Sequence, residues 1–244
     1  MLKKSKITVT VPHRISGFFE IVDKTDQGEK ITNPEKIGSR GAGFNLNAVG
    51  KTEIIIEKCN QDSKPDCRVY INSEEVNQKA ETTYFIYNAI KNSIKKRINI
   101  KIFHNFELPV GCGYGASGSG ALGTIFGLDS LLKLKLSYYQ KGKIAHVAEV
   151  INKTGLGTVC GQLSGGLCIL KEAGHPCVSE QITVPEDLIV VCGTFGAIPT
   201  KSIITSDDFI NKIKTAGRRA MLRVLADKNV KTFMRASIDF VKET

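Results

Sequence analysis

The chain has 244 residues, of which 41% are hydrophobic and 24% charged, a composition that supports a buried core and excludes a disordered, collagen-like or coiled-coil chain. No apolar run reaches the roughly 18–20 residues of a membrane helix, and the N-terminus lacks the apolar region of a secretory signal, so we expect a cytoplasmic protein without membrane contact. The net charge of +10 favours an anionic partner; because aromatic residues make up only 7%, we expect a small phosphorylated or carboxylated substrate and no nucleic acid.

Alternating apolar residues predict a first strand at residues 7–11, followed by a loop-like stretch to about residue 43. Further strands are expected at 53–57 and 68–71, as a hairpin, and at 98–103, 166–171 and 188–192. Helical spacing predicts helices at 75–96, 117–133 and 137–152, a short helix ending at 163, and helices at 206–228 and 230–241. Because strands and helices do not alternate regularly, we predict an α+β fold.

The chain has seven cysteines, none of them in a C-x-x-C pair, and several lie inside apolar runs. Together with four scattered histidines they show no zinc-binding spacing. We therefore predict reduced, buried thiols at Cys59, Cys67, Cys112, Cys160, Cys168, Cys177 and Cys192.

A glycine-rich stretch carries the strongest functional signal, since seven of the chain's 23 glycines lie between Gly111 and Gly127. The stretch leads directly into a predicted helix, whose unpaired N–H groups and positive dipole end favour a bound phosphate. Ser117 and Ser119 add hydroxyl groups that suit a phosphate or Mg²⁺. A glycine-rich contact between a helix and a sheet, with no ligand, is the structural alternative.

Three phosphate-binding loops are compatible with parts of the sequence. Gly113-x-Gly115-x-x-Gly118 fits a dinucleotide fingerprint, but the acidic residue expected after a following strand is missing. Residues 50–52 (Gly-Lys-Thr) suggest a Walker loop, but the preceding glycine is two positions too far away. The third pattern is P-x-x-x-G-x-G-x-S, which begins at Pro109 and ends at Ser117 and resembles the loop of the GHMP kinases.

Two further blocks resemble the same superfamily. Residues 9–14 (Val-Thr-Val-Pro-His-Arg) look like its first motif, and residues 154–166 look like the region that carries the catalytic aspartate, seven residues before a Gly-Gly pair. The resemblance implies a two-layer fold with mixed sheets and an active site in the cleft between two subdomains. It also implies an N-terminal ATP-binding domain over residues 1–150 and a short C-terminal domain over 151–244.

Within the superfamily, residues 15–20, 38–43, 114–122 and 145–149 are similar to the archaeal pantoate kinase group. That group phosphorylates pantoate on the archaeal route to coenzyme A, and a few relatives act on pantothenate. The resemblance therefore implies an ATP- and Mg²⁺-dependent kinase acting on the primary hydroxyl of a pantoyl acid. Thr158 stands where the family has its aspartate, and the chain looks short by about its last fifth. Both departures suggest a roomier acceptor pocket and favour pantothenate over pantoate.

The resemblance also implies roles for individual residues. Ser117 and Glu149 would hold Mg²⁺ and take part in catalysis, and Thr158 would orient the acceptor hydroxyl. Ser39 and Arg40 lie in a glycine-rich turn, where Arg40 can clamp the substrate carboxylate through two parallel hydrogen bonds. The expected nucleotide-binding residues are Pro109, Gly111, Gly113, Tyr114, Gly115, Ala116, Ser117, Gly118 and Ser119. The expected substrate-binding residues are His13, Arg14, Ser39, Arg40 and His146.

Other functions stay open at this stage. A different GHMP kinase would act on homoserine or a mevalonate-like alcohol. A non-catalytic protein would bind a nucleotide as a sensor or use its positive charge to bind nucleic acid. A homodimer is one expected assembly, because GHMP kinases are often dimers.

Overall fold

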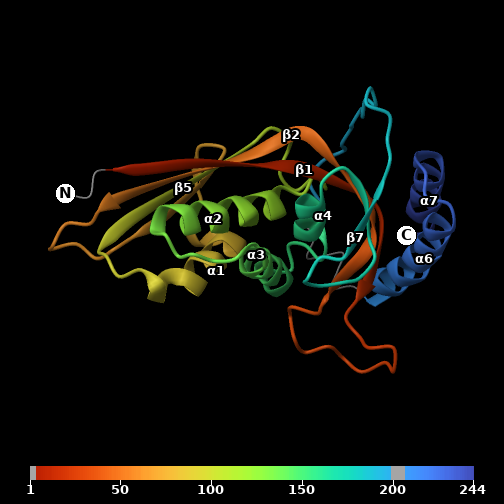
Figure 1. The fold of residues 1–244 in the computed structure, drawn as a ribbon, viewed down its shortest axis with the longest axis horizontal. Helices are drawn as coiled ribbons and strands as arrows, with labels where there is room; N and C mark the ends of the chain where they lie inside the picture. The colour runs from red at the N-terminus through yellow and green to blue at the C-terminus, as the bar shows by residue number, and fades with distance from the viewer. Residues whose placement is uncertain (1–3, 199–206) are drawn as a thin grey trace.

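The computed structural model describes residues 4–198 and 207–244 (Figure 1). These residues form a seven-stranded sheet in the order β4-β3-β5-β2-β6-β7, with β1 paired to β2. The strands are β1 (Ser5–Val22), β2 (Gly38–Lys58), β3 (Cys67–Ile71), β4 (Glu74–Glu75), β5 (Ile98–Phe106), β6 (Leu167–Leu170) and β7 (Ser179–Ile182). The helices are α1 (Glu81–Ile90), α2 (Ala116–Leu132), α3 (Tyr138–Asn152), α4 (Thr158–Ser164), α6 (Asp207–Ala226) and α7 (Val230–Glu243), with 3₁₀ turns η1 (Asn77–Lys79) and η2 (Lys91–Ser93).

The long antiparallel pair β1 and β2 runs through the whole molecule. Its register shifts between Pro12 and Arg14 and again between Ser16 and Phe18. Such bulges bend a strand and increase its twist, and they accommodate a proline that cannot donate to the ladder. The loop predicted over residues 12–43 is therefore wrong for residues 12–22 and 38–43, which belong to β1 and β2, while residues 23–37 lie between the strands as expected.

Two hydrophobic cores lie along this pair of strands. In the first core, Ile54 and Ile102 of the sheet pack against Leu122 and Ile125 of α2. In the second core, Phe18 of β1 packs with Phe233 of α7 and with residues of β6 and α6. Figure 1 shows α1, α2 and α3 on one face of the sheet and α6 and α7 at its far end. β1 therefore passes from one core to the other between Val11 and Phe18, and β2 between Phe44 and Ile54.

The α+β fold class is confirmed, and α2, α3, α4 and α7 lie close to their predicted positions. The expected helix at 206–228 corresponds to α6, and its first residue lies outside the described residues. The hairpin expected from 53–57 and 68–71 is wrong, because β3 pairs in parallel with β5, which separates it from β2. The strand expected at 188–192 is also wrong. Its apolar residues face solvent, with Ile189 84% and Val191 92% exposed.

No helix among the described residues is long and apolar enough to cross a membrane. The domain boundary expected at residue 150 stays a prediction. The two hydrophobic cores do not divide the chain at residue 150, because residues of β1 and β2 contribute to both cores.

Candidate active site

A cavity of about 520 Å³ lies where β1 and β2 pass between the two cores. Four segments and Leu170 of β6 build its walls: the bulged part of β1, the start of β2, the glycine-rich loop with the first turn of α2, and the connection from α3 to the first residue of α4. The lining residues are Arg14, Ser16, Phe18, Phe19, Ser39, Gly41, Ala42, Val110, Gly111, Gly113, Tyr114, Gly115, Ala116, Ser117, Lys153, Thr154, Gly155, Leu156, Gly157, Thr158 and Leu170.

The glycine-rich loop forms one wall and ends at Gly115, the N-cap of α2. Gly115 has a φ of 68°, in the left-handed region that favours glycine, and no side chain caps the helix. The N–H groups of a helix's first turn have no partner within the helix, and together with the helix dipole they attract an anion. This wall therefore suits a phosphate group.

Ser117, in the first turn of α2, connects the cavity to a buried carboxylate. Its hydroxyl donates to Oε1 of Glu149 on α3 at 2.5 Å. Glu149 is only 1% exposed and packs so closely on Gly155 that a Cβ there would lie 2.5 Å from Oε2. Burial raises the pKa of Glu149 to about 7, although hydrogen bonds from Ser117, Val159 and Thr154 favour the charged form.

Glu149 has no ion-pair partner within the part of the chain that the structure describes. A buried carboxylate beside a hydroxyl that lines the cavity provides the oxygen ligands that Mg²⁺ prefers. Ser117 and Glu149 therefore fit a magnesium site at the edge of the phosphate-binding wall.

Arg14 lines the cavity and carries a buried positive charge, and its guanidinium lies at Gly161 and Cys168, next to the lining residues. Its side chain, 3% exposed overall, lies against Gly161 of α4, and its Nη1 donates to Sγ of Cys168 at 3.3 Å. Burial lowers the pKa of Arg14, and across residues 4–198 and 207–244 no carboxylate pairs with it. Because a buried charge without a counterion is costly, this position favours an anionic ligand.

The comparisons with known proteins agree with this arrangement. The family described as GHMP kinases N terminal domain matches residues 81–166. The pantoate kinase of Methanocaldococcus jannaschii is 31% identical over 96% of this chain and 78% of its own length. This chain belongs to the GHMP kinases. The pantoate kinase of Thermococcus kodakarensis is 28% identical over 98% of this chain and 76% of its own.

Solved structures support the same family. A protein described as "Phosphotransferase related to CoA biosynthesis pathway" has a TM-score of 0.82 and 28% identity, covering 98% of this chain and 76% of its own. Mevalonate diphosphate decarboxylase from Staphylococcus aureus, at 11% identity, shares the fold with a TM-score of 0.62, covering 98% of this chain and 72% of its own. The resemblance to the pantoate kinase group is therefore confirmed, and this GHMP kinase is a phosphotransferase that acts on a hydroxyl group.

The structure separates the predicted nucleotide-binding residues into two groups. Ser119 is fully buried and donates to the carbonyl of Val11, so it holds α2 on the sheet. Gly118 faces Thr158 and Gln162 of α4, and Pro109 is outside the lining set. The predicted residues that line the cavity are Gly111, Gly113, Tyr114, Gly115, Ala116 and Ser117.

Two predicted substrate residues, Arg14 and Ser39, line the cavity, and the others do not. Arg40 donates to both carboxylate oxygens of Glu20, at 2.7 and 3.2 Å, and this ion pair raises the pKa of Arg40. His13 donates to the carbonyl of Tyr114 at 2.8 Å. His146 donates to the carbonyl of Ile37 at 2.9 Å, and burial lowers its pKa to about 4.

The side chains of Arg40, His13 and His146 therefore lie in the supporting structure behind the cavity walls. Arg40, His13 and His146 are each held by a partner within the protein, so the structure gives none of them a direct position toward a substrate in the cavity. The clamp role expected for Arg40 does not match its place in the fold. Arg14 is the arginine that lines the cavity.

Thr158 begins α4 and lines the cavity, as expected for the position that carries the family's aspartate. Its methyl group packs against Gly115 and Gly118. The lining residues include no carboxylate, and the carboxylate of Glu149 lies behind Ser117.

Two residues at the site, Lys153 and Gln162, were not predicted from the sequence. Lys153 lines the cavity from the C-cap of α3, where a lysine had no distinguishing pattern. Gln162 donates to the carbonyls of Pro12 and Gly115. Gln162 follows Thr158 by four residues, which places both on the same helix face. This spacing could have predicted from the sequence that Gln162 lies near the site.

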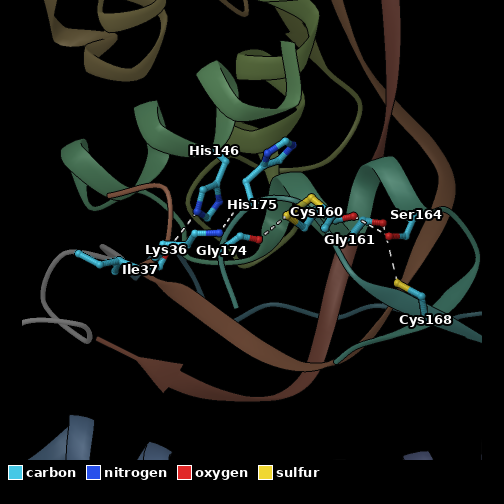
Figure 2. Close-up of a disulfide and its surroundings, with 10 residues drawn as sticks. Lys36, Ile37, His146, Cys160, Gly161, Ser164, Cys168, Gly174 and His175 are labelled. Atoms are coloured by element: carbon cyan, nitrogen blue, oxygen red, sulfur yellow. Dashed lines mark hydrogen bonds between the residues drawn. A yellow bond between two sulfur atoms is a disulfide. The ribbon is translucent and has the colours of Figure 1, made fainter. Parts of the chain in front are cut away.

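The expectation that all cysteines are reduced is wrong for Cys160 and Cys177, which form a disulfide across 17 residues (Figure 2). Cys160 lies on α4, and Cys177 lies in the connection from β6 to β7. Only the tertiary fold brings these segments together, so a search for local cysteine pairs could not find them. Cys192 is exposed and Cys112 half-buried, which also corrects the expectation of burial for Cys192.

The disulfide predicts a loss of stability on reduction. A bond that closes a loop of about 15 residues contributes about 3 kcal/mol, because it restricts the unfolded chain. We expect the double variant Cys160→Ser/Cys177→Ser to lose about that free energy of unfolding in urea and to become insensitive to a thiol reductant. Cys192→Ser is the control and should keep the reductant sensitivity. Equal stability of wild type and double variant under oxidising conditions would contradict the bond.

The buried carboxyl predicts a specific dependence of stability on pH. Because the folded pKa of Glu149, about 7, lies above its ordinary value of 4.5, its protonation stabilises the fold at low pH, and this contribution is lost as pH rises through 7. We expect Glu149→Gln to gain stability relative to wild type between pH 5 and pH 8, measured by urea unfolding. Glu35→Gln is the control, since ion pairing lowers the pKa of Glu35, which stays ionised across this range. If the stability of Glu149→Gln relative to wild type stays constant or falls over this pH range, the raised pKa of Glu149 is contradicted.

Proposed function

We propose that this GHMP kinase transfers the γ-phosphoryl group of ATP to the primary hydroxyl of pantoate, in the synthesis of coenzyme A. The single observation that carries the proposal is Arg14, a buried cation without a counterion in the same cavity as the glycine-rich loop and Ser117. A phosphate-binding wall and a carboxylate-binding cation at one cavity suit a small acid that bears an alcohol. The names of the similar pantoate kinases support this choice.

On the nucleotide side, the first turn of α2 and the loop from Gly111 to Gly115 would bind the phosphates. Ser117 and Glu149 would hold Mg²⁺, which neutralises charge on the phosphates when bound. Ser117 remains fixed toward the cavity because its hydroxyl is bonded to Glu149. Lys153 would add a positive charge at the cavity wall.

On the acceptor side, the position of Arg14 favours the shorter pantoyl acid. Its guanidinium lies at Gly161, three residues after Thr158, and positions with this helical spacing are about 5–6 Å apart. In pantoate three carbon atoms link the carboxylate to the primary hydroxyl oxygen, so both ends can meet Arg14 and Thr158. Pantothenate, which the sequence favoured, carries its carboxylate on an additional amide arm.

Catalysis does not need a strong base among the lining residues. Phosphoryl transfer depends mainly on positioning and charge neutralisation, and its transition state is loose. A threonine hydroxyl cannot remove a proton near neutral pH, so Thr158 would orient the acceptor hydroxyl through a hydrogen bond. The acceptor proton would leave late, to an oxygen of the transferred phosphoryl group.

The acceptor preference is tested by ADP release from ATP and Mg²⁺ with pantoate, pantothenate, homoserine, mevalonate or no acceptor. We expect the highest kcat/KM with pantoate, and a loss of about 100-fold or more in kcat for Ser117→Ala and Glu149→Ala, because both remove positioning of charge at the phosphates. A higher kcat/KM with another acceptor would replace pantoate as the substrate. ATP binding without any acceptor-dependent ADP would contradict the kinase reaction and leave a nucleotide-binding protein.

The two arginines predict different effects on acceptor binding. Arg14→Met removes the proposed carboxylate partner and should raise the KM for pantoate about 30- to 100-fold, as for a lost charge-assisted hydrogen bond pair, while ATP affinity changes little. Arg40→Met is the matched control, because its guanidinium is paired with Glu20 away from the cavity. A larger increase in the KM for pantoate in Arg40→Met than in Arg14→Met would show that Arg40 binds the substrate carboxylate instead.

A further inference from the structure

Gln162 connects three elements that build the active site. It lies on α4, is 5% exposed and is absent from the cavity lining. Its amide nitrogen donates to the carbonyl of Pro12 at 2.8 Å and to the carbonyl of Gly115 at 3.0 Å. One planar amide therefore joins β1, the glycine-rich loop and α4, in addition to the bond from the N–H of Arg14 to the carbonyl of Tyr114.

The two acceptor carbonyls lie at positions where regular structure ends. Pro12 directly precedes the first register shift of β1, and Gly115 is the left-handed residue that begins α2 without a side-chain cap. Neither position is held by an uninterrupted ladder or by a capping side chain. Gln162 adds a hydrogen bond at each of these two irregular positions, and at Gly115 it adds to the bond that the same carbonyl accepts from the N–H of Ser119 at 3.1 Å.

The oxygen of the Gln162 amide shows that packing alone does not explain a glutamine at this position. Oε1 of Gln162 is buried without a hydrogen-bond partner among the described residues. It lies against Gly118 in the first turn of α2, where a Cβ would be 2.5 Å away. A buried acceptor without a partner destabilises a fold, and an apolar side chain of similar size would avoid that cost. The amide is therefore retained for its two donor bonds to the cavity walls.

We propose that Gln162 is a positioning residue that holds the glycine-rich loop in its phosphate-binding geometry and so determines nucleotide affinity. It acts through Gly115, whose carbonyl it fixes, and has no contact with the nucleotide itself. The identity of the nucleotide as ATP rests on the proposed function. The role of Gln162 rests on its contacts with the loop.

The chain contains a matched control that contacts the same helix. Gln181 of β7 also donates through its amide nitrogen to two backbone carbonyls, those of Ser164 and Gly165 at the C-terminal end of α4. It lies outside the cavity lining. Loss of Gln181 loosens α4 at its far end without touching the loop, so it separates a general effect on the helix from a specific effect on phosphate binding.

The experiment compares Gln162→Ala, Gln162→Met and Gln181→Ala in the full chain. Calorimetric titration with ATP and Mg²⁺, without an acceptor, gives the dissociation constants, and steady-state kinetics gives kcat and both KM values. We expect both Gln162 variants to bind ATP about 10-fold or more weakly, as for two lost hydrogen bonds of about 1 kcal/mol each, with the KM for pantoate within about 3-fold of wild type. Gln181→Ala should bind ATP like wild type.

Gln162→Met keeps the volume of the side chain and gives a folded variant if the alanine variant unfolds. A folded Gln162→Met with the ATP affinity of wild type would overturn the proposal, and so would an equal loss of affinity in Gln181→Ala. If wild type binds ATP but phosphorylates no acceptor, the proposed function fails, while the ATP dissociation constants still decide the role of Gln162.

Discussion

The pairing of β1 with β2 through two register shifts is the constraint on which the active site depends. These strands contribute to both cores, and the shifts lie where they pass from one core to the other. At Gly43 the strands approach so closely that a Cβ would clash with the carbonyl of Ile15. The bulged strand turns there toward the glycine-rich loop, and the N–H of Arg14 donates to the carbonyl of Tyr114 at 3.1 Å. A cavity at the junction of the two cores follows from this bend.

Two buried charges of opposite sign give this cavity its chemistry. Glu149 lies behind Ser117, and Arg14 lies against α4. Neither has a counterion in the described parts of the chain, so each lowers the stability of the fold. A magnesium–nucleotide complex and a small carboxylic acid would supply the missing opposite charges. The two unpaired charges therefore lower the stability of the fold, and binding of the nucleotide complex and the acid would raise it again.

The sequence predicted the features that depend on short-range pattern. The glycine-rich loop, the helix that follows it, and Ser117 and Glu149 all follow from local spacing or from motif resemblance. The choice between Arg14 and Arg40 required strand pairing, because Glu20 lies directly opposite Arg40 in the register of β1 and β2. The interpretation of residues 12–43 as a loop concealed this pair. The disulfide and the contacts of Gln162 join segments that only the tertiary fold brings together.

The central claim is that this cavity transfers a phosphoryl group to the primary alcohol of pantoate. The most direct measurement is ³¹P NMR of the products formed from ATP, Mg²⁺ and pantoate. The account predicts a phosphomonoester signal split by the two protons of the adjacent CH₂ group, appearing in equal amount with ADP. Inorganic phosphate as the only new signal, or a phosphoester formed with pantothenate and not with pantoate, would contradict it.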